Sequence, residues 1–144
     1  MDKDKVISKE ISLEIDSRLE NINLITKEVK KICKYPNLSK IETYEIELCI
    51  VEACTNVIRH AYNGKPGNTV KLTIKLKNKC KLIFELYDWG KSMDTIHLDK
   101  AEADEHTFSE GGRGLLIIKK LMDKVNYQAK KSNNVLTMTK KIGH

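Results

Sequence analysis

The chain has 144 residues, of which 40% are hydrophobic and 32% are charged, and its formal net charge is +6 at pH 7. This length fits one domain, 1–144, with its own core, and the composition argues against a disordered or membrane-embedded chain. No stretch approaches the ~18 apolar residues of a membrane span, and no hydrophobic signal core begins the sequence, so we expect a cytoplasmic protein without a membrane partner. The positive charge is spread along the chain, which argues little for direct nucleic-acid binding.

The four cysteines are Cys33, Cys49, Cys54 and Cys80. They form no C-x-x-C pair and have no metal-type spacing with histidine, which argues against a zinc or redox site. We expect buried, reduced thiols.

The first element is a strand, because apolar residues alternate with mostly polar ones at Ile7, Ile11, Leu13 and Ile15, interrupted by Lys9. The sequence "SRLE" at 17–20 matches a capping box and is followed by apolar residues at helical spacing. It predicts a helix of about 17 residues that ends before Pro36.

A second capping box, "SKIE" at 39–42, opens a longer predicted helix that runs to the stop signal Asn63-Gly64. Alternating residues at 70–77 and "KLIFELYD" at 81–88 then predict a hairpin with one lysine-rich face. That face is either a solvated sheet surface or a contact surface for an acidic partner.

Residues 91–110 show neither period, and a loop this long is uncommon unless it acts, for example, as a lid. Its histidines, His97 and His106, lie among acidic residues, but their spacing fits no metal site. "GGRG" then leads into a predicted helix at 115–125, and two closing strands follow at 126–131 and 135–142. The sum is one α/β domain with about five strands and three helices.

Glu52 and Asn56 are four residues apart on the long helix and therefore share one face. Alone, that face is most simply solvent-exposed. A carboxylate and an amide at this spacing are also suited to act as a general base and as an oxygen ligand of magnesium. His60 continues the row, and packing or hydrogen bonding at the helix end is its simplest role.

Two glycine-containing segments follow. In "LYDWG", Asp88 ends a strand and Gly90 follows; this is either an ordinary turn or a carboxylate that accepts a hydrogen bond from an adenine amine. In "GGRGLL" at 111–116, glycines before a helix are either a hinge or a phosphate cradle, and Arg113 is either a surface residue or a contact for the terminal phosphate.

The three signals occur in a fixed order: Glu-x-x-x-Asn, Asp-x-Gly, and Gly-Gly-x-Gly before a helix. This order resembles the N, G1 and G2 boxes of the ATPase/kinase superfamily of gyrase, histidine kinases and mismatch-repair ATPases. "VEACTNVIRHAY", "YDWGKSMD" and "GGRGLLIIKKLMDKV" are most similar to the bacterial anti-sigma-factor serine kinases of the RsbW and SpoIIAB type. The resemblance covers nearly the whole chain.

The resemblance implies a Bergerat-type ATP-binding fold. This is an α+β two-layer sandwich, with a mixed, mainly antiparallel sheet of about five strands and three helices on one face. ATP would lie between the helices and a lid at 91–110.

Residue by residue, the resemblance makes Glu52 the general base, Asn56 the magnesium ligand and Asp88 the adenine-binding carboxylate, with Gly90 beside it. It assigns the phosphate side to Gly111, Gly112, Arg113, Gly114 and Leu115. The family's Gly-Thr near the last strand corresponds to Asn133-Asn134 or is displaced to Thr137, and the proline common after the first box is absent from "WGKSM".

The resemblance also implies a function: a kinase that uses Mg-ATP to phosphorylate a serine of a STAS-type anti-anti-sigma antagonist and that sequesters a sigma factor, as a homodimer. The alternative is a nucleotide-dependent protein-binding regulator without phosphotransfer. A fragment of a sensor histidine kinase is less consistent, because the ATP domain fills the chain and leaves no room for a phosphoacceptor helical hairpin. A basic nucleic-acid binder is a more distant alternative, and it would show steep salt dependence.

Overall fold

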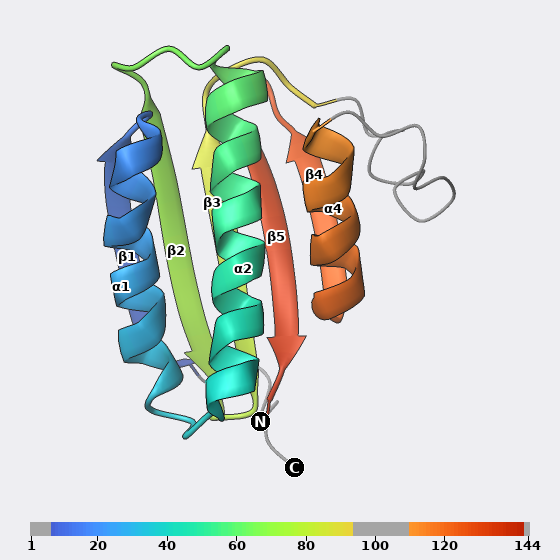
Figure 1. The fold of residues 1–144 in the computed structure, drawn as a ribbon. Coiled ribbons are helices and arrows are strands. Elements are labelled where there is room, and N and C mark those ends of the chain that lie inside the picture. The colour runs from blue at the N-terminus through green and yellow to red at the C-terminus, as the bar shows by residue number, and fades with distance from the viewer. Residues whose placement is uncertain (1–6, 94–109, 143–144) are drawn as a thin grey trace.

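The computed structural model describes residues 7–93 and 110–142, and these form a two-layer α+β sandwich (Figure 1). The strands follow the order β1-β2-β3-β5-β4, and all four neighbouring pairs are antiparallel. Their bounds are β1 Ile7–Asp16, β2 Thr69–Lys77, β3 Lys81–Asp88, β4 Lys124–Ala129 and β5 Asn134–Lys141. The predicted α+β sandwich of five strands and three helices is confirmed, but the described sheet is antiparallel throughout rather than mixed. Most of the predicted lid, 94–109, lies outside the described residues.

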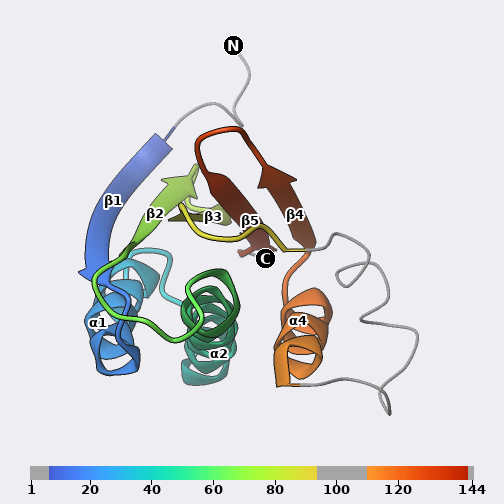
Figure 2. The same ribbon diagram turned by 90° about the horizontal axis from the view of Figure 1, so that it is seen from above.

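The helices α1 (Ile22–Cys33), α2 (Lys40–Asn56) and α4 (Glu110–Leu121) lie side by side on one face of the sheet (Figure 2). Apolar residues of the central strands alternate toward this face and are almost fully buried against the helices. The largest fully buried side chains of the core, from strands and helices together, are Phe84, Leu72, Ile74, Leu76, Leu82, Leu86, Ile25, Ile32, Ile46, Ile50, Ile58 and Ile118. No described helix is long and apolar enough to cross a membrane.

The lysine-rich face of the hairpin is the sheet surface away from the helices. Lys75 forms a 2.8 Å ion pair with Glu85 on the neighbouring strand, and Lys71 lies 5.7 Å from the centroid of the Tyr87 ring. These cross-strand pairs agree with a solvated face. Lys9, the polar interruption of β1, places its ammonium 4.3 Å from the centroid of Tyr35.

The two predicted capping boxes have different outcomes. Ser39 accepts a hydrogen bond from the Glu42 N–H, and the Glu42 side chain accepts one from Ser39 N, so the second box is confirmed. The prediction at 17–20 is wrong: Ser17 instead donates to the Lys65 carbonyl and accepts from Asn68 N. As a result α1 begins at Ile22 after a short 3-10 turn and has 12 residues, fewer than predicted.

The long helix continues beyond Asn56 as a π-helical turn, Val57–Ala61. Such turns are rare and occur often at functional sites. The chain then reverses at Asn63 and Gly64, which have φ of 54° and 73°, as the stop signal predicts.

Two sequence predictions need correction. The segment 111–114 lies inside α4, which begins at Glu110, and the helix ends at Leu121 because β4 starts at Lys124. Three cysteines are buried as expected, but Cys80 is exposed in the β2–β3 turn.

Candidate functional site

One half of the candidate site is built at the end of β3. Asp88 is the last residue of this strand and is only 4% exposed, although it carries a carboxylate. It pairs in register with Asn134, the first residue of β5, whose amide donates a 2.9 Å hydrogen bond to Asp88 Oδ1. The Gly90 N–H donates to the same oxygen at 3.0 Å. Asp88 is therefore held by the turn that follows β3 and by the first residue of the neighbouring strand β5.

Burial raises the pKa of Asp88, and the hydrogen bonds from Asn134 and Gly90 lower it in part. The raised pKa means that burial costs the ionised form more free energy than these two bonds return. A ligand donor at the other carboxylate oxygen would stabilise the ionised form further.

Gly90 lies against the end of the long helix. A Cβ atom at this position would stand 2.4 Å from the Ala61 carbonyl oxygen, so no larger residue fits without movement of backbone. The next residue, Lys91, donates its N–H to that carbonyl at 3.0 Å. The glycine thus brings the Asp88 turn to the end of the helix that carries Glu52 and Asn56.

Two tyrosine hydroxyls fix the segment on either side of Gly90. The Tyr62 hydroxyl donates to the Thr69 carbonyl at 2.6 Å and accepts from Trp89 N at 2.8 Å. The Tyr127 hydroxyl accepts from Met93 N at 2.8 Å. Both ends of residues 89–93 are therefore tied to the sheet and to the helix end before the chain enters the undescribed segment.

The other half of the site lies on α2. Glu52 and Asn56 are half-buried, so the simple solvent-face interpretation does not hold. They lie against Gly114 of α4: a Cβ atom there would be 2.8 Å from Glu52 Oε2 and 3.1 Å from Asn56 Nδ2. The absence of a side chain at Gly114 is what allows α4 to approach these two groups.

The halves are joined through the start of α4. Leu115, next to Gly114, is 5% exposed and packs with Met93 and Tyr127, the pair that holds the segment after Gly90. Glu52, Asn56, Asp88 and the beginning of α4 consequently share one end of the sandwich.

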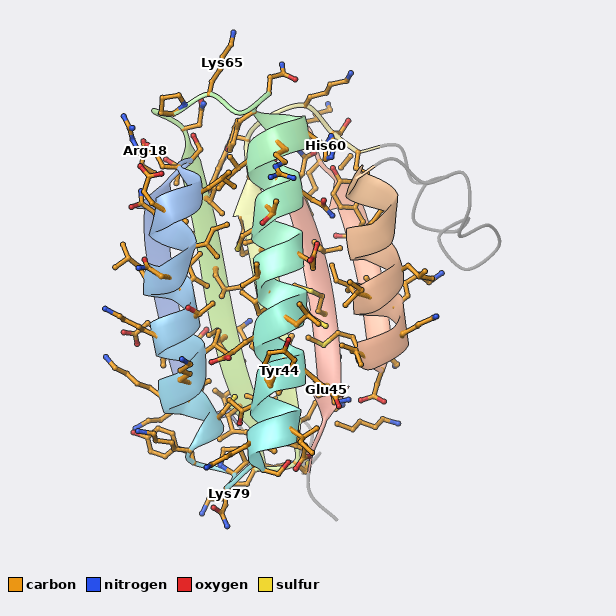
Figure 3. All side chains as sticks on the ribbon, viewed as in Figure 1. Arg18, Tyr44, Glu45, His60, Lys65 and Lys79 are labelled. Carbon is orange, nitrogen blue, oxygen red and sulfur yellow. The ribbon has the colours of Figure 1, made fainter. Side chains whose placement is uncertain are left out.

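The remaining predicted residues are placed less uniformly. Gly111, Gly112 and Arg113 are in the first turn of α4, and the Arg113 side chain is outside what the structure describes. Thr137 does not join the site: it pairs with Glu85, and because side chains alternate it faces away from the helices. His60 is exposed in the π-helical turn that continues α2 (Figure 3).

Sequence reasoning missed Tyr62 and Tyr127 and left the role of Asn134 open. Asp88 and Asn134 are 46 residues apart, and only the strand register brings them together. Tyr62 and Tyr127 are also distant from Asp88 in sequence and belong to no local motif with it, so the sequence does not distinguish these two site tyrosines from ordinary core residues.

The donor set at Glu52 and Asn56 fits a magnesium ion that takes most of its ligands from phosphate and water. Both side chains supply the oxygen donors that this ion prefers, and Gly114 adds no side chain of its own next to them. Among the described residues, no group of three or more His, Cys, Asp or Glu side chains is placed to hold a metal by itself.

Comparison with known proteins agrees with this geometry. Residues 15–140 match the histidine kinase-like ATPase domain. The serine-protein kinase RsbW of Bacillus pumilus is 30% identical over 137 residues, a match that covers 90% of this chain and 84% of the relative. The chain belongs to this ATPase family, in its RsbW-type branch. The RsbW of Halalkalibacterium halodurans is also 30% identical, over 90% of this chain and 82% of that protein.

Solved structures share the fold at low identity. The RsbU and RsbW domains of a Mycobacterium tuberculosis protein match with a TM-score of 0.69 and 11% identity, over 95% of this chain and 33% of that longer one. The SiaB–SiaC complex from Pseudomonas aeruginosa matches with a TM-score of 0.61 and 11% identity, over 94% of this chain and 91% of that one. Membership of the ATPase family implies that the protein binds ATP.

Proposed function

We propose that the protein is a Mg-ATP-dependent protein serine kinase. The observation that carries the proposal is the contact of Gly114 with both Glu52 and Asn56, which brings a carboxylate and an amide of α2 against the N-terminal part of α4. Asp88 lies at the same end, on the far side of Gly90. The names of the RsbW relatives, serine-protein kinases, support the same activity.

Each group has a role in this proposal. Asp88 accepts a hydrogen bond from the adenine amine, and the free N–H groups at the start of α4, which include Gly111 and Gly112, bind phosphate oxygens. Asn56 offers its amide oxygen to magnesium, and the chemistry that Mg²⁺ supplies when bound is neutralisation of phosphate charge. The glycines matter here because a side chain would keep the phosphates away from these amides.

Glu52 acts as the general base. The seryl oxygen of the protein substrate forms a bond to the γ-phosphorus, the bond from that phosphorus to the bridging oxygen of ADP breaks, and the seryl proton passes to Glu52. Glu52 is half-buried and its Oε2 lies next to Gly114, so its carboxylate is directed toward α4 rather than fully into solvent.

The partners follow from the sequence resemblance. The substrate would be a serine of a STAS-type anti-anti-sigma antagonist, and the protein would also sequester a sigma factor, as a homodimer in the cytoplasm. Phosphorylation of the antagonist would then decide which partner is bound. The match to the SiaB chain of a two-protein complex supports the fold, not the identity of these partners.

The test is Glu52→Gln, which keeps the size and the hydrogen-bonding shape of the side chain but removes the base. Transfer of label from ATP to the antagonist serine is expected to fall ~10²- to 10⁴-fold, with Mg-ADP affinity nearly unchanged. Glu45→Gln is the matched control, because it is on the same helix about two turns away and should leave transfer intact.

Unchanged transfer in the Glu52→Gln variant would remove Glu52 from the mechanism. If the wild-type protein binds nucleotide but never transfers label to any serine of the antagonist, the alternative of a nucleotide-dependent binding regulator is favoured.

A further inference from the structure

Asn134 makes two hydrogen bonds that the proposed roles do not use. Its Nδ2 donates to Asp88 Oδ1 at 2.9 Å and to the Gly90 carbonyl at 3.0 Å, and the residue is 4% exposed. Both neighbours are acceptors, so the amide must turn its nitrogen toward them and both of its hydrogens are committed.

We propose that Asn134 is a positioning residue of the adenine-binding site. Its amide holds the Asp88 carboxylate in the one orientation that leaves Oδ2 for the exocyclic amine of adenine. This inference rests on the proposed function, in which Asp88 binds adenine. Asp88 Oδ1 already receives the Gly90 N–H and the Asn134 amide, whereas no donor among the described residues reaches Oδ2. A carboxylate in which one oxygen accepts two hydrogen bonds has little freedom to rotate.

The second bond of Asn134 closes the turn itself. By binding the Gly90 carbonyl as well as the Asp88 carboxylate, one side chain spans the strand end and the residue two positions later. A hydroxyl residue has one hydrogen and can make only one of these bonds. The Asn134 amide therefore makes a pair of hydrogen bonds that the threonine of the family's Gly-Thr cannot make at this position.

The surroundings of Asp88 make this position sensitive to pH. The titratable groups that interact with its charge are the phenols of Tyr62 and Tyr127, whose pKa values are raised mainly by burial and which are neutral near pH 7. The Asn134 hydrogen bond lowers the pKa of Asp88 against the larger effect of burial. Without this bond the Asp88 carboxylate takes up a proton at higher pH, and the protonated group is a poorer acceptor for the hydrogen bond from the adenine amine.

The experiment measures Mg-ADP affinity from pH 5 to 8 for the wild type and for Asn134→Ala, with Trp89 fluorescence or calorimetry as the readout. Wild-type binding weakens as the pH falls through the pKa of Asp88. In Asn134→Ala this acid limb, the fall in affinity toward low pH, is expected to begin at higher pH. On the limb the variant should bind Mg-ADP ~10-fold more weakly than the wild type, and at pH 8 the loss should be smaller, because a hydrogen bond to a charged group has been removed.

Base selectivity gives a second readout. Mg-IDP presents a carbonyl where ADP has its amine, so the wild type should bind ADP more tightly. The ratio of the two affinities should fall in Asn134→Ala and should recover in part in Asn134→Thr, which keeps one donor. A residue that only supports the fold would weaken both nucleotides equally at every pH.

Asn133→Ala is the matched control, since Asn133 precedes the strand and only its backbone carbonyl, which accepts from Lys130 N, takes part in a described hydrogen bond. If Asn134→Ala does not fold, Asn134→Thr carries the same two measurements. An unchanged acid limb and an unchanged ADP-to-IDP ratio would overturn the role of Asn134. Failure of the wild type to bind Mg-ADP at any pH would instead overturn the proposed function.

Discussion

At the scale of single residues, Asp88 is the point where stability and ligand binding oppose each other. Burial raises its pKa in the folded protein above the ordinary value of 3.8. The folded chain then binds this proton more tightly than the unfolded chain does. The contribution of Asp88 to stability is consequently greatest at low pH and falls as the pH rises through its folded pKa.

Asp88→Asn tests this conflict. The amide oxygen can still accept from Gly90 and Asn134 without a buried charge, so the melting temperature of the free protein at pH 7 is expected to rise. The remaining NH₂ group would face the amine of adenine, and the stabilisation by Mg-ADP should shrink or disappear. Thermal melts with and without Mg-ADP measure both effects, and a variant that loses stability but keeps the full ligand shift would contradict the assignment.

Residues that act through local spacing could be predicted, and those that act through tertiary contact could not. Glu52 and Asn56 share a helix face by their separation alone, and the structure brings both to Gly114. The sequence left Asn133-Asn134 and Thr137 open as the match to the family's Gly-Thr, and Thr137 was the predicted contact. Only the register of β3 with β5 shows that Asn134, not Thr137, faces the helices.

At the scale of elements, the contact between the β3 end and the π-helical turn organises the site. The Ala61 carbonyl lies where a side chain at position 90 would stand and accepts from Lys91 N. Because the obstacle is backbone rather than a flexible side chain, a substitution at Gly90 cannot be absorbed by a rotamer change.

Gly90→Ala is therefore expected to destabilise the fold by ~1–3 kcal/mol, the usual cost of overpacking a tight contact. Urea unfolding followed by circular dichroism measures it as a lower midpoint with an unchanged slope. Wild-type stability in this variant would show that the helix end and the Asp88 turn are not in contact in solution.

The capping boxes show what limits prediction of elements. Ser17 and Ser39 have the same S-x-x-E pattern, and only Ser39 caps a helix. Ser17 is taken up by the loop at 65–68, which is distant in sequence, so local propensity loses to a tertiary hydrogen bond. The early start of α4 was missed for a related reason, since glycines disfavour a helix interior and the sequence alone places them before it.

At the scale of the whole molecule, the number of strands and helices and their alternation could be predicted from periodicity. The strand order β1-β2-β3-β5-β4 could not, because it depends on which edges meet after the chain crosses from β3 through α4 to β4. The two halves of the candidate site belong to elements that this order and the helix layer bring to one end of the domain.

Ligand binding at that end should stabilise the whole domain. Mg-ADP at ~100 times its dissociation constant is expected to add ~2.7 kcal/mol to the free energy of unfolding, or roughly 5–10 °C in melting temperature. Differential scanning fluorimetry over a range of Mg-ADP concentrations measures it. No shift at any practical concentration would contradict the nucleotide site itself.

The exposed thiol of Cys80 gives the molecule a natural attachment point. Burial raises the pKa of Cys33 to about 11 and those of Cys49 and Cys54 to about 12, which keeps them protonated and unreactive, whereas Cys80 lies in solvent. It immediately precedes β3, at the opposite end of the strand from Asp88 and ~26 Å away from it along the chain. Maleimide chemistry should thus label or immobilise the unmodified sequence at one position, with the candidate site facing away from the surface.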